Sequence, residues 1–148
     1  MLVTKVKRPI SKVFLHCSAS DNPAHDDAAV IEEWHIERGF TGIGYHYFIQ
    51  ADGTVQVGRP LERVPAAQEG HNAGSIAICL HGLTNFTDAQ YDALRALCGD
   101  ILMVYPNVTF HGHKEVNRHK TCPVYNYKKV LNLDVGGKMR GINTENEV

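Results

Sequence analysis

The sequence predicts a single α/β domain, with a central mixed β-sheet flanked by about three helices. Short apolar runs rich in strand-forming residues alternate with segments of helical periodicity. The pair Asp52-Gly53 lies between two strand-like runs and indicates a hairpin, which is antiparallel, whereas helical crossovers favour parallel pairs. The 148 residues suit one domain whose core is large enough to fold alone. We therefore expect one sheet that contains both kinds of pairing.

The first half of the chain is expected to supply a buried strand, a helix and the hairpin. Strands are expected over residues 13–17, 45–50 and 54–57, because these runs are rich in strand-forming residues. Asp26 or Asp27 can cap a helix that runs to about Arg38. On this helix we expect Trp34 to belong to the core and its neighbour His35 to be more exposed.

The second half begins with a loop over residues 58–73, which is too long for a simple turn and should lie over another part of the molecule. A buried strand is expected over 75–80 and a short one over 108–111. Thr87 and Gln90 fit a capping box, so they predict a helix between these strands. Asn126 can cap a last short helix. We expect the domain to span residues 1–134 and residues 135–148 to form a flexible tail.

The composition excludes several classes of function. The formal net charge is −1 and no block of basic residues stands out, so nucleic acid is not an expected partner. No apolar run is long enough to cross a bilayer, and no signal peptide is visible, so we expect synthesis in the cytoplasm and no membrane partner. The four cysteines are expected to be free thiols in such a compartment.

Residues 110–123 concentrate three histidines, a cysteine and several bases, which suggests a zinc site. One stretch cannot complete such a site, and a catalytic zinc usually takes three protein ligands. The candidates are His16, His111, His113, His119 and Cys122. In an extended strand His111 and His113 share one side, so spacing alone leaves the choice open. The alternatives are a core role for His16 and surface histidines beside a free cysteine.

Several short pieces of the sequence, taken in order, point to one family. They are Val13-Phe14-Leu15-His16-Cys17-Ser18-Ala19, Glu33-Trp34-His35, Gly44-Tyr45-His46-Tyr47-Phe48-Ile49, Asp52-Gly53-Thr54-Val55, Gly70-His71-Asn72, Ser75-Ile76-Ala77-Ile78-Cys79-Leu80, Gly112-His113-Lys114-Glu115-Val116 and Lys120-Thr121-Cys122-Pro123. The ordered set, from about residue 11 to 131, resembles the type-2 N-acetylmuramoyl-L-alanine amidases. That family includes small phage enzymes and shares its fold with the peptidoglycan recognition proteins.

The resemblance implies an activity and a set of roles. It implies zinc-dependent hydrolysis of the amide between N-acetylmuramic acid and L-alanine in bacterial peptidoglycan, by a phage or prophage endolysin. The implied zinc ligands are His16, His113 and Cys122. Tyr45 matches the family's catalytic tyrosine and Lys120 its catalytic lysine. These residue types suit the reaction. The tyrosine hydroxyl can orient the attacking water or transfer its proton, and the lysine ammonium can offset charge on the oxyanion.

Substrate contacts and departures from the family pattern complete the implied site. The expected substrate-binding residues are Trp34, His46, His71 and Asn72. Gln68 stands where a histidine of the family would fall, which puts a substrate contact there in doubt. The segment between His113 and Cys122 is one residue longer than in phage relatives, with His119 as the extra residue. Cys17 could compete as a ligand, but we expect it to point to the face opposite His16.

Two other functions compete with the amidase. A non-catalytic peptidoglycan-binding module has the same fold, but such relatives characteristically lack the cysteine ligand that is present here. A cysteine hydrolase would use Cys17, which lies in an apolar strand and not at a helix N-terminus. We expect a monomer whose partner is peptidoglycan and which leaves the host cytoplasm through a holin pore. Some phage relatives also bind a polymerase, and the sequence assigns no such partner.

Overall fold

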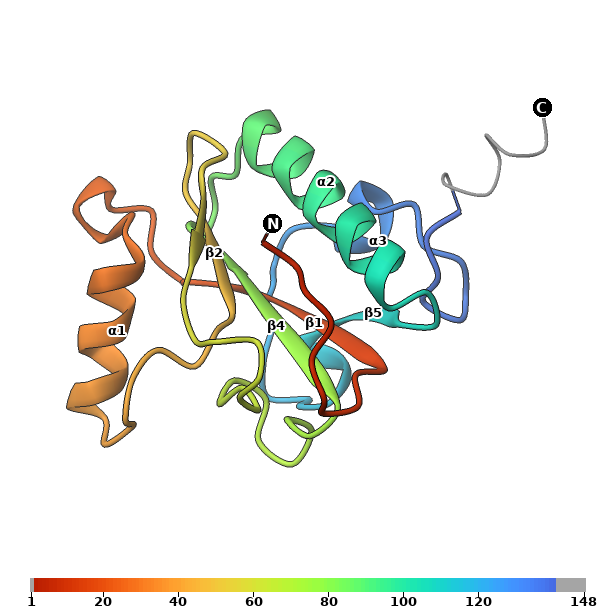
Figure 1. The fold of residues 1–148 in the computed structure, drawn as a ribbon. Helices are drawn as coiled ribbons and strands as arrows, with labels where there is room; N and C mark the ends of the chain where they lie inside the picture. The colour runs from red at the N-terminus through yellow and green to blue at the C-terminus, as the bar shows by residue number, and fades with distance from the viewer. Residues whose placement is uncertain (1, 141–148) are drawn as a thin grey trace.

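A five-stranded sheet forms the centre of the molecule, in the order β3-β2-β4-β1-β5 (Figure 1). The computed structural model describes residues 2–140. The strands are β1 (Lys12–Cys17), β2 (Tyr47–Ile49), β3 (Val55–Val57), β4 (Ser75–Leu80) and β5 (Thr109–Gly112). β1 pairs in parallel with β4 and β5, and β2 pairs in parallel with β4 but antiparallel with β3. The predicted mixed sheet is therefore confirmed, and so is the hairpin at Asp52-Gly53.

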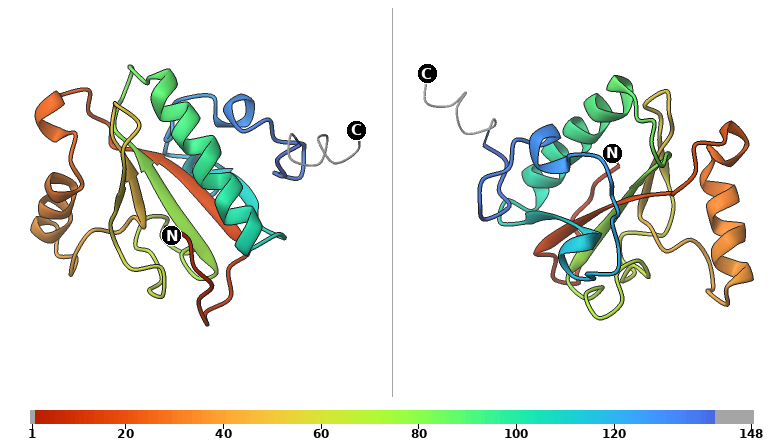
Figure 2. Two further views of the ribbon diagram at one scale, coloured as in Figure 1. Left: turned by 45° about the horizontal axis from the view of Figure 1, so that its top comes forward. Right: turned by 180° about the vertical axis from the view of Figure 1, so that it is seen from behind.

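The helices lie on opposite sides of this sheet (Figures 1 and 2). They are α1 (Ala28–Glu37), α2 (Asp88–Val104) and α3 (Tyr127–Val130), with short 3₁₀ turns η1 (Pro23–His25) and η2 (His113–Glu115). The Asp27 carboxylate caps α1, and the predicted capping box of Thr87 and Gln90 begins α2. Within residues 2–140, none of the helices is both long enough and apolar enough to cross a bilayer.

Successive side chains of β1 point to opposite faces of the sheet. Val13, Leu15 and Cys17 join the larger core cluster, which also holds the buried apolar residues of α2. Phe14 and His16 alternate with them and point to the other face, where Ile31 of α1 packs with Phe48 in a smaller cluster. Cys17 thus points away from His16, as the sequence indicated.

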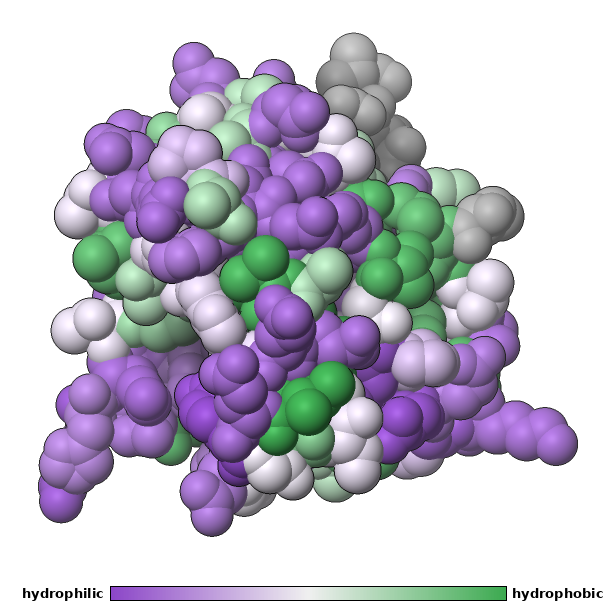
Figure 3. All heavy atoms as spheres, turned by 90° about the vertical axis from the view of Figure 1, so that its left-hand side faces the viewer, coloured by the Kyte–Doolittle hydropathy of each residue, from purple (hydrophilic) through white to green (hydrophobic). Residues whose placement is uncertain are grey.

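The burial of α1 corrects one expectation. His35 is only 5% exposed, so the prediction that it would be more exposed than Trp34 was wrong. His35 follows buried Ile31 by four residues, which puts both on the helix face that meets the sheet. Trp34 is half-buried. The outer face over α1 carries mainly hydrophilic side chains, with separate hydrophobic groups among them (Figure 3).

The chain after α3 folds back onto the sheet. The Phe110 amide donates a hydrogen bond to the Gly137 carbonyl at 2.8 Å, and the Arg140 amide donates one to the Asn132 carbonyl at 3.0 Å. Gly137 has φ +83°, which lets the chain reverse there. Residues 135–140 are therefore not the free tail that the sequence suggested, and the domain extends to at least residue 140. The expected flexibility of residues 141–148 lies outside the described residues.

Candidate active site

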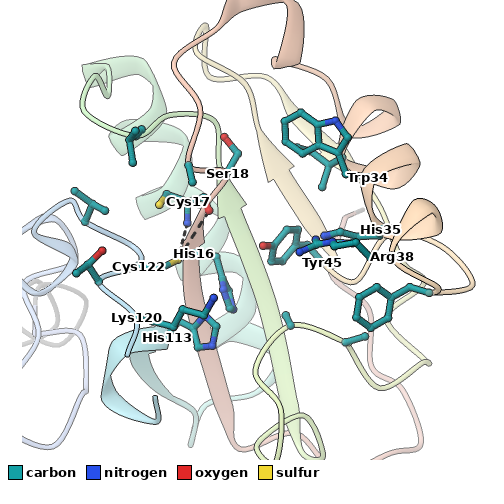
Figure 4. A pocket seen from close by; sticks show the side chains of 18 of the residues that line it. His16, Cys17, Ser18, Trp34, His35, Arg38, Tyr45, His113, Lys120 and Cys122 are labelled. Atoms are coloured by element: carbon teal, nitrogen blue, oxygen red, sulfur yellow. Dashed lines mark hydrogen bonds between the residues drawn. The ribbon is translucent and has the colours of Figure 1, made fainter. Parts of the chain in front are cut away.

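An open cavity of about 690 Å³ lies between α1 and the segment that follows β5 (Figure 4). Trp34, His35 and Arg38 of α1 form part of one wall, and His113, Lys120 and Cys122 form part of the opposite one. His16 and Tyr45 lie between the two walls (Figure 4). Basic, aromatic and thiol side chains from four separate parts of the chain therefore converge on one cavity.

The sheet topology explains how His16 and His113 meet. His16 lies near the end of β1, and His113 directly follows β5. β1 and β5 are parallel neighbours, so these ends share one edge of the sheet. The two imidazole centroids are 4.7 Å apart. A fold that pairs the first strand with the last thereby joins residues about a hundred positions apart.

Cys122 is held beside them by backbone hydrogen bonds. The segment after β5 crosses over β1 (Figure 2, right), where the Cys17 amide donates to Cys122 Sγ at 3.0 Å. The Lys114 amide donates to the Cys122 carbonyl at 2.9 Å, which closes the segment on itself. One possible ligand atom each from His16, His113 and Cys122 lie within 4.8 Å of one another. Among residues 2–140, this is the group of three possible metal ligands whose atoms lie so close together.

The protonation of this trio suits a metal site. Burial, and then the neighbouring His113, lower the pKa of His16 to about 3. Burial, and then Lys120, lower the pKa of His113. Both rings are thus neutral at pH 7 and keep a lone pair. A hydrogen bond with Cys17, and then burial, raise the pKa of the Cys122 thiol, so a metal ion bound there would displace a proton.

The donor set fits zinc. Two imidazole nitrogens and one thiolate are ligands that Zn²⁺ accepts, and three protein ligands leave a fourth position for water or substrate. Ligand atoms on one tetrahedral zinc lie roughly 3.5 Å apart, given metal–ligand bonds of about 2.0–2.3 Å. The three ligand atoms lie within 4.8 Å of one another, so they would need to move only slightly to bind one zinc ion.

Tyr45 is fixed at the cavity by its neighbours. Its ring centroid lies 5.0 Å from that of His16 and 5.4 Å from that of His35. Burial lowers the pKa of His35 to about 4, and the neutral ring accepts a hydrogen bond at Nδ1 from the Gly44 amide at 2.9 Å. Burial also raises the pKa of Tyr45 well above its ordinary value, so its hydroxyl stays protonated at neutral pH.

Trp34 and His46, two of the expected substrate contacts, differ in whether they reach the cavity. Trp34 lines the cavity, where its ring also meets the His25 ring edge-on at 4.8 Å. His46 is 1% exposed and is not among the described residues of the cavity wall. Its Nδ1 accepts from the Ala77 amide and its Nε2 donates to the Arg63 carbonyl. The structure thus gives His46 a role in joining loop and sheet, with no nitrogen left for a substrate.

The other two expected contacts belong to the loop before β4. His71 is exposed and its ring lies 6.5 Å from that of Phe14, outside the cavity wall as described. The Asn72 Oδ1 accepts hydrogen bonds from the amides of Ala67 and Gln68, at 3.1 and 3.0 Å. Asn72 therefore shapes the loop.

The remaining histidines of the cluster separate in the structure. His111 contacts Thr109 Oγ1 and Glu115 Oε1 through its two nitrogens, at 2.6 and 2.9 Å, and does not belong to the trio. His119, the extra residue, is exposed on the cavity wall.

Arg38 and His35 were assigned no role at the site from the sequence, and Gln68 was noted only as a departure from the family pattern. Arg38 and His35 line the cavity, and the spacing of His35 from Ile31 was the available signal. Gln68 is fully buried and its Oε1 lies 2.8 Å from His16 Nε2. No local pattern points to this contact, because 52 residues separate the partners. Gln68 is thus a neighbour of a possible ligand and is not exposed to substrate.

Comparison with known proteins adds sequence and structural relatives. The family profile of N-acetylmuramoyl-L-alanine amidases matches residues 6–125. The endolysin of Escherichia phage T7 is 35% identical over 133 residues, which cover 84% of this chain and 87% of that protein. The amidase LysC from Clostridium intestinale superposes with a TM-score of 0.76 at 30% identity, over 84% and 85% of the two chains. Peptidoglycan recognition protein SD of Drosophila shares the fold, with a TM-score of 0.69 at 21% identity over 80% and 76%.

Proposed function

The chain belongs to the N-acetylmuramoyl-L-alanine amidase family, and we propose that it uses zinc to cleave bacterial peptidoglycan as a phage endolysin. The bond cleaved is the amide between N-acetylmuramic acid and L-alanine. The observation that carries the zinc assignment is the convergence of His16, His113 and Cys122 in one open cavity. A zinc ion bound there would polarise the amide carbonyl and lower the pKa of a bound water toward neutrality.

The side chains of the cavity have distinct tasks in this proposal. The protonated Tyr45 hydroxyl orients the attacking water or transfers its proton. The Lys120 ammonium offsets the negative charge that develops on the amide carbonyl oxygen, an effect of about 3 kcal/mol for a single donor in comparable sites. Trp34 supplies an aromatic surface against which the substrate can pack. Lys120 is close enough to His113 to lower the pKa of that histidine, which supports its assignment to the reacting centre.

The test is digestion of purified peptidoglycan with and without a chelator, followed by identification of the new chain ends. We expect new L-alanine amino termini and no new reducing sugar ends. The chelator should abolish the reaction and added zinc should restore it. Reducing ends without L-alanine termini would contradict the proposal, as would full activity in chelator.

The variant Cys122→Ser distinguishes this enzyme from a binding module on the same fold. It should lose the bound zinc and at least about 100-fold in activity, because removing a ligand exceeds the 10- to 100-fold cost of losing a residue that supports one. Metal content is measured in the same preparation. A variant that still lyses cell walls at the original rate would show that the zinc site is not catalytic.

The cellular setting is part of the proposal. The substrate lies outside the cytoplasmic membrane, so we propose that the chain acts as a monomer after release through a holin pore. Cells that express the chain with a holin should lyse, and cells that express it alone should not. Lysis at equal rates without the holin would contradict this route.

A further inference from the structure

We propose that Gln68 is a positioning residue that fixes the tautomer of His16, so that Nδ1 of His16 faces the metal. This inference rests on the zinc function proposed above. Gln68 lies in the loop between β3 and β4 and is fully buried. Its Oε1 is 2.8 Å from Nε2 of His16, which is itself 1% exposed. Both side chains are therefore almost entirely removed from solvent.

The direction of the hydrogen bonds around Gln68 follows from backbone carbonyls, which can only accept. The Ser75 hydroxyl donates to the Asn72 carbonyl at 2.8 Å. Its single proton is used there, so at 2.7 Å the Ser75 oxygen must accept from the amide group of Gln68. The second proton of that amide group points to the His71 carbonyl at 3.4 Å. Both donor positions of Gln68 are thus occupied on the side away from His16.

This arrangement leaves only the amide oxygen of Gln68 facing His16. An oxygen accepts, so Nε2 of His16 must carry the proton. A neutral imidazole has one N–H, and the lone pair is therefore on Nδ1. The Asn72 carbonyl thus sets the tautomer of His16 through Ser75 and Gln68. Histidine ligands of metals generally donate their second nitrogen to such an acceptor, and losing that acceptor costs about 10- to 100-fold in metal affinity.

The loop is built to hold Gln68 in this place. The Asn72 Oδ1 accepts from the amides of Ala67 and Gln68, so it fixes the backbone from which the Gln68 side chain extends. The loop was expected to cover another part of the molecule. Its buried glutamine reaches His16 at Nε2.

The experiment measures zinc dissociation constants by competition with a chromogenic chelator. Gln68→Met removes the acceptor at similar volume, and we expect zinc to bind about 10- to 100-fold more weakly. Gln68→Glu keeps an acceptor for Nε2–H and should bind zinc within about threefold of the original protein, since carboxylates serve the same purpose in other zinc sites. Unchanged affinity in Gln68→Met would overturn the proposal, as would equal losses in both variants.

Gln90→Met is the matched control. Gln90 is also fully buried and donates to the carbonyls of Ile49 and His81, far along the chain from the ligands. Its variant should lose thermal stability and keep its zinc affinity. If Gln90→Met weakened zinc binding as much as Gln68→Met, the effect would be general destabilisation and the proposal would fail.

A second readout does not require zinc. NMR of the histidine ring nitrogens, with His16 assigned from a His16→Asn variant, should show a protonated Nε2 in the original protein and in Gln68→Glu. In Gln68→Met the preference should disappear. If the original protein bound no zinc, the proposed function would fail while this measurement still tested the tautomer. A protonated Nδ1 in the original protein would overturn the inference itself.

Discussion

Lys120 and Lys114 are two exposed lysines on one segment, and they differ in where their charges act. Lys120 lines the cavity and lowers the pKa of His113. Lys114 is adjacent to His113 in sequence, yet its Nζ lies over the Tyr127 ring at 5.9 Å from the centroid. The charge of Lys120 therefore lies at the cavity, whereas the charge of Lys114 lies over the Tyr127 ring.

We predict that Lys120→Met keeps its zinc and loses about 100-fold in kcat, because the ammonium acts on charge that develops in the transition state. Lys114→Met should keep kcat within about threefold. Turnover of a defined muropeptide and metal content would be measured for both. Equal activity of the two variants would show that Lys120 has no part in the chemistry.

Among the elements, residue 44 packs tightly against the loop between β3 and β4. A Cβ added at Gly44 would lie 2.2 Å from the Ala66 carbonyl oxygen, and the Ala66 amide donates to the Gly44 carbonyl at 3.1 Å. Backbone atoms cannot yield as a flexible side chain can. Gly44 therefore allows the loop to pack directly against the residue that precedes Tyr45.

We predict that Gly44→Ala destabilises the protein by about 1–3 kcal/mol, the usual cost of overpacking. Gly99→Ala is the opposite case, because a Cβ at Gly99 of α2 meets nothing within 4 Å. It should stabilise the protein by about 0.5–1 kcal/mol, since alanine favours a helix more than glycine does. Chemical denaturation measures both changes. A Gly44→Ala protein as stable as the original would mean that the loop moves freely at this point.

The elements were predictable wherever one local pattern dominated. Apolar runs predicted β1 and β4, and the capping box of Thr87 and Gln90 predicted the start of α2. The side of α1 that faces the sheet was misjudged at His35, because a histidine four residues after Ile31 reads as polar although its ring is buried. The packing of residues 135–140 also escaped, because glycine-rich polar sequence carries no signal of the backbone bonds it makes to Phe110.

At the scale of the whole molecule, a buried histidine links stability to pH. Burial, and to a smaller extent Arg8 and Arg59, lower the pKa of His46 to about 4. Its ordinary value is 6.5. A folded pKa below the unfolded one means that the neutral ring contributes its full stability above about pH 6.5. That contribution declines as the pH falls from 6.5 to about 4, and a shift of this size corresponds to roughly 3 kcal/mol.

We predict that the free energy of unfolding falls across this pH window and that His46→Asn falls less steeply. The asparagine oxygen can still accept from the Ala77 amide, as His46 Nδ1 does, but it does not titrate. Urea denaturation between pH 7 and pH 4, in chelator to exclude metal linkage, gives both slopes. Parallel slopes would show that His46 is not responsible.

The whole site was predictable only in outline. The resemblance implied the trio of His16, His113 and Cys122, and the topology explains their meeting because β1 pairs with β5. The partner of His16 could not be found, since Gln68 reaches it through a loop whose course depends on tertiary contacts. For the same reason the sequence could not show that both nitrogens of His46 are engaged inside the fold.

The pairing of β1 with β5 also sets an order in time. A chain leaves the ribosome from its N-terminus, so His16 appears long before His113 and Cys122. A nascent chain that ends before residue 113 can carry all five strands and the whole of α2, but it has only one of the three proposed ligands. The proposed centre is complete only when the segment that follows β5 packs across β1 and brings Cys122 to the Cys17 amide. Synthesis must therefore reach residue 122 before the proposed zinc site can form, and we expect shorter precursors to leave peptidoglycan intact.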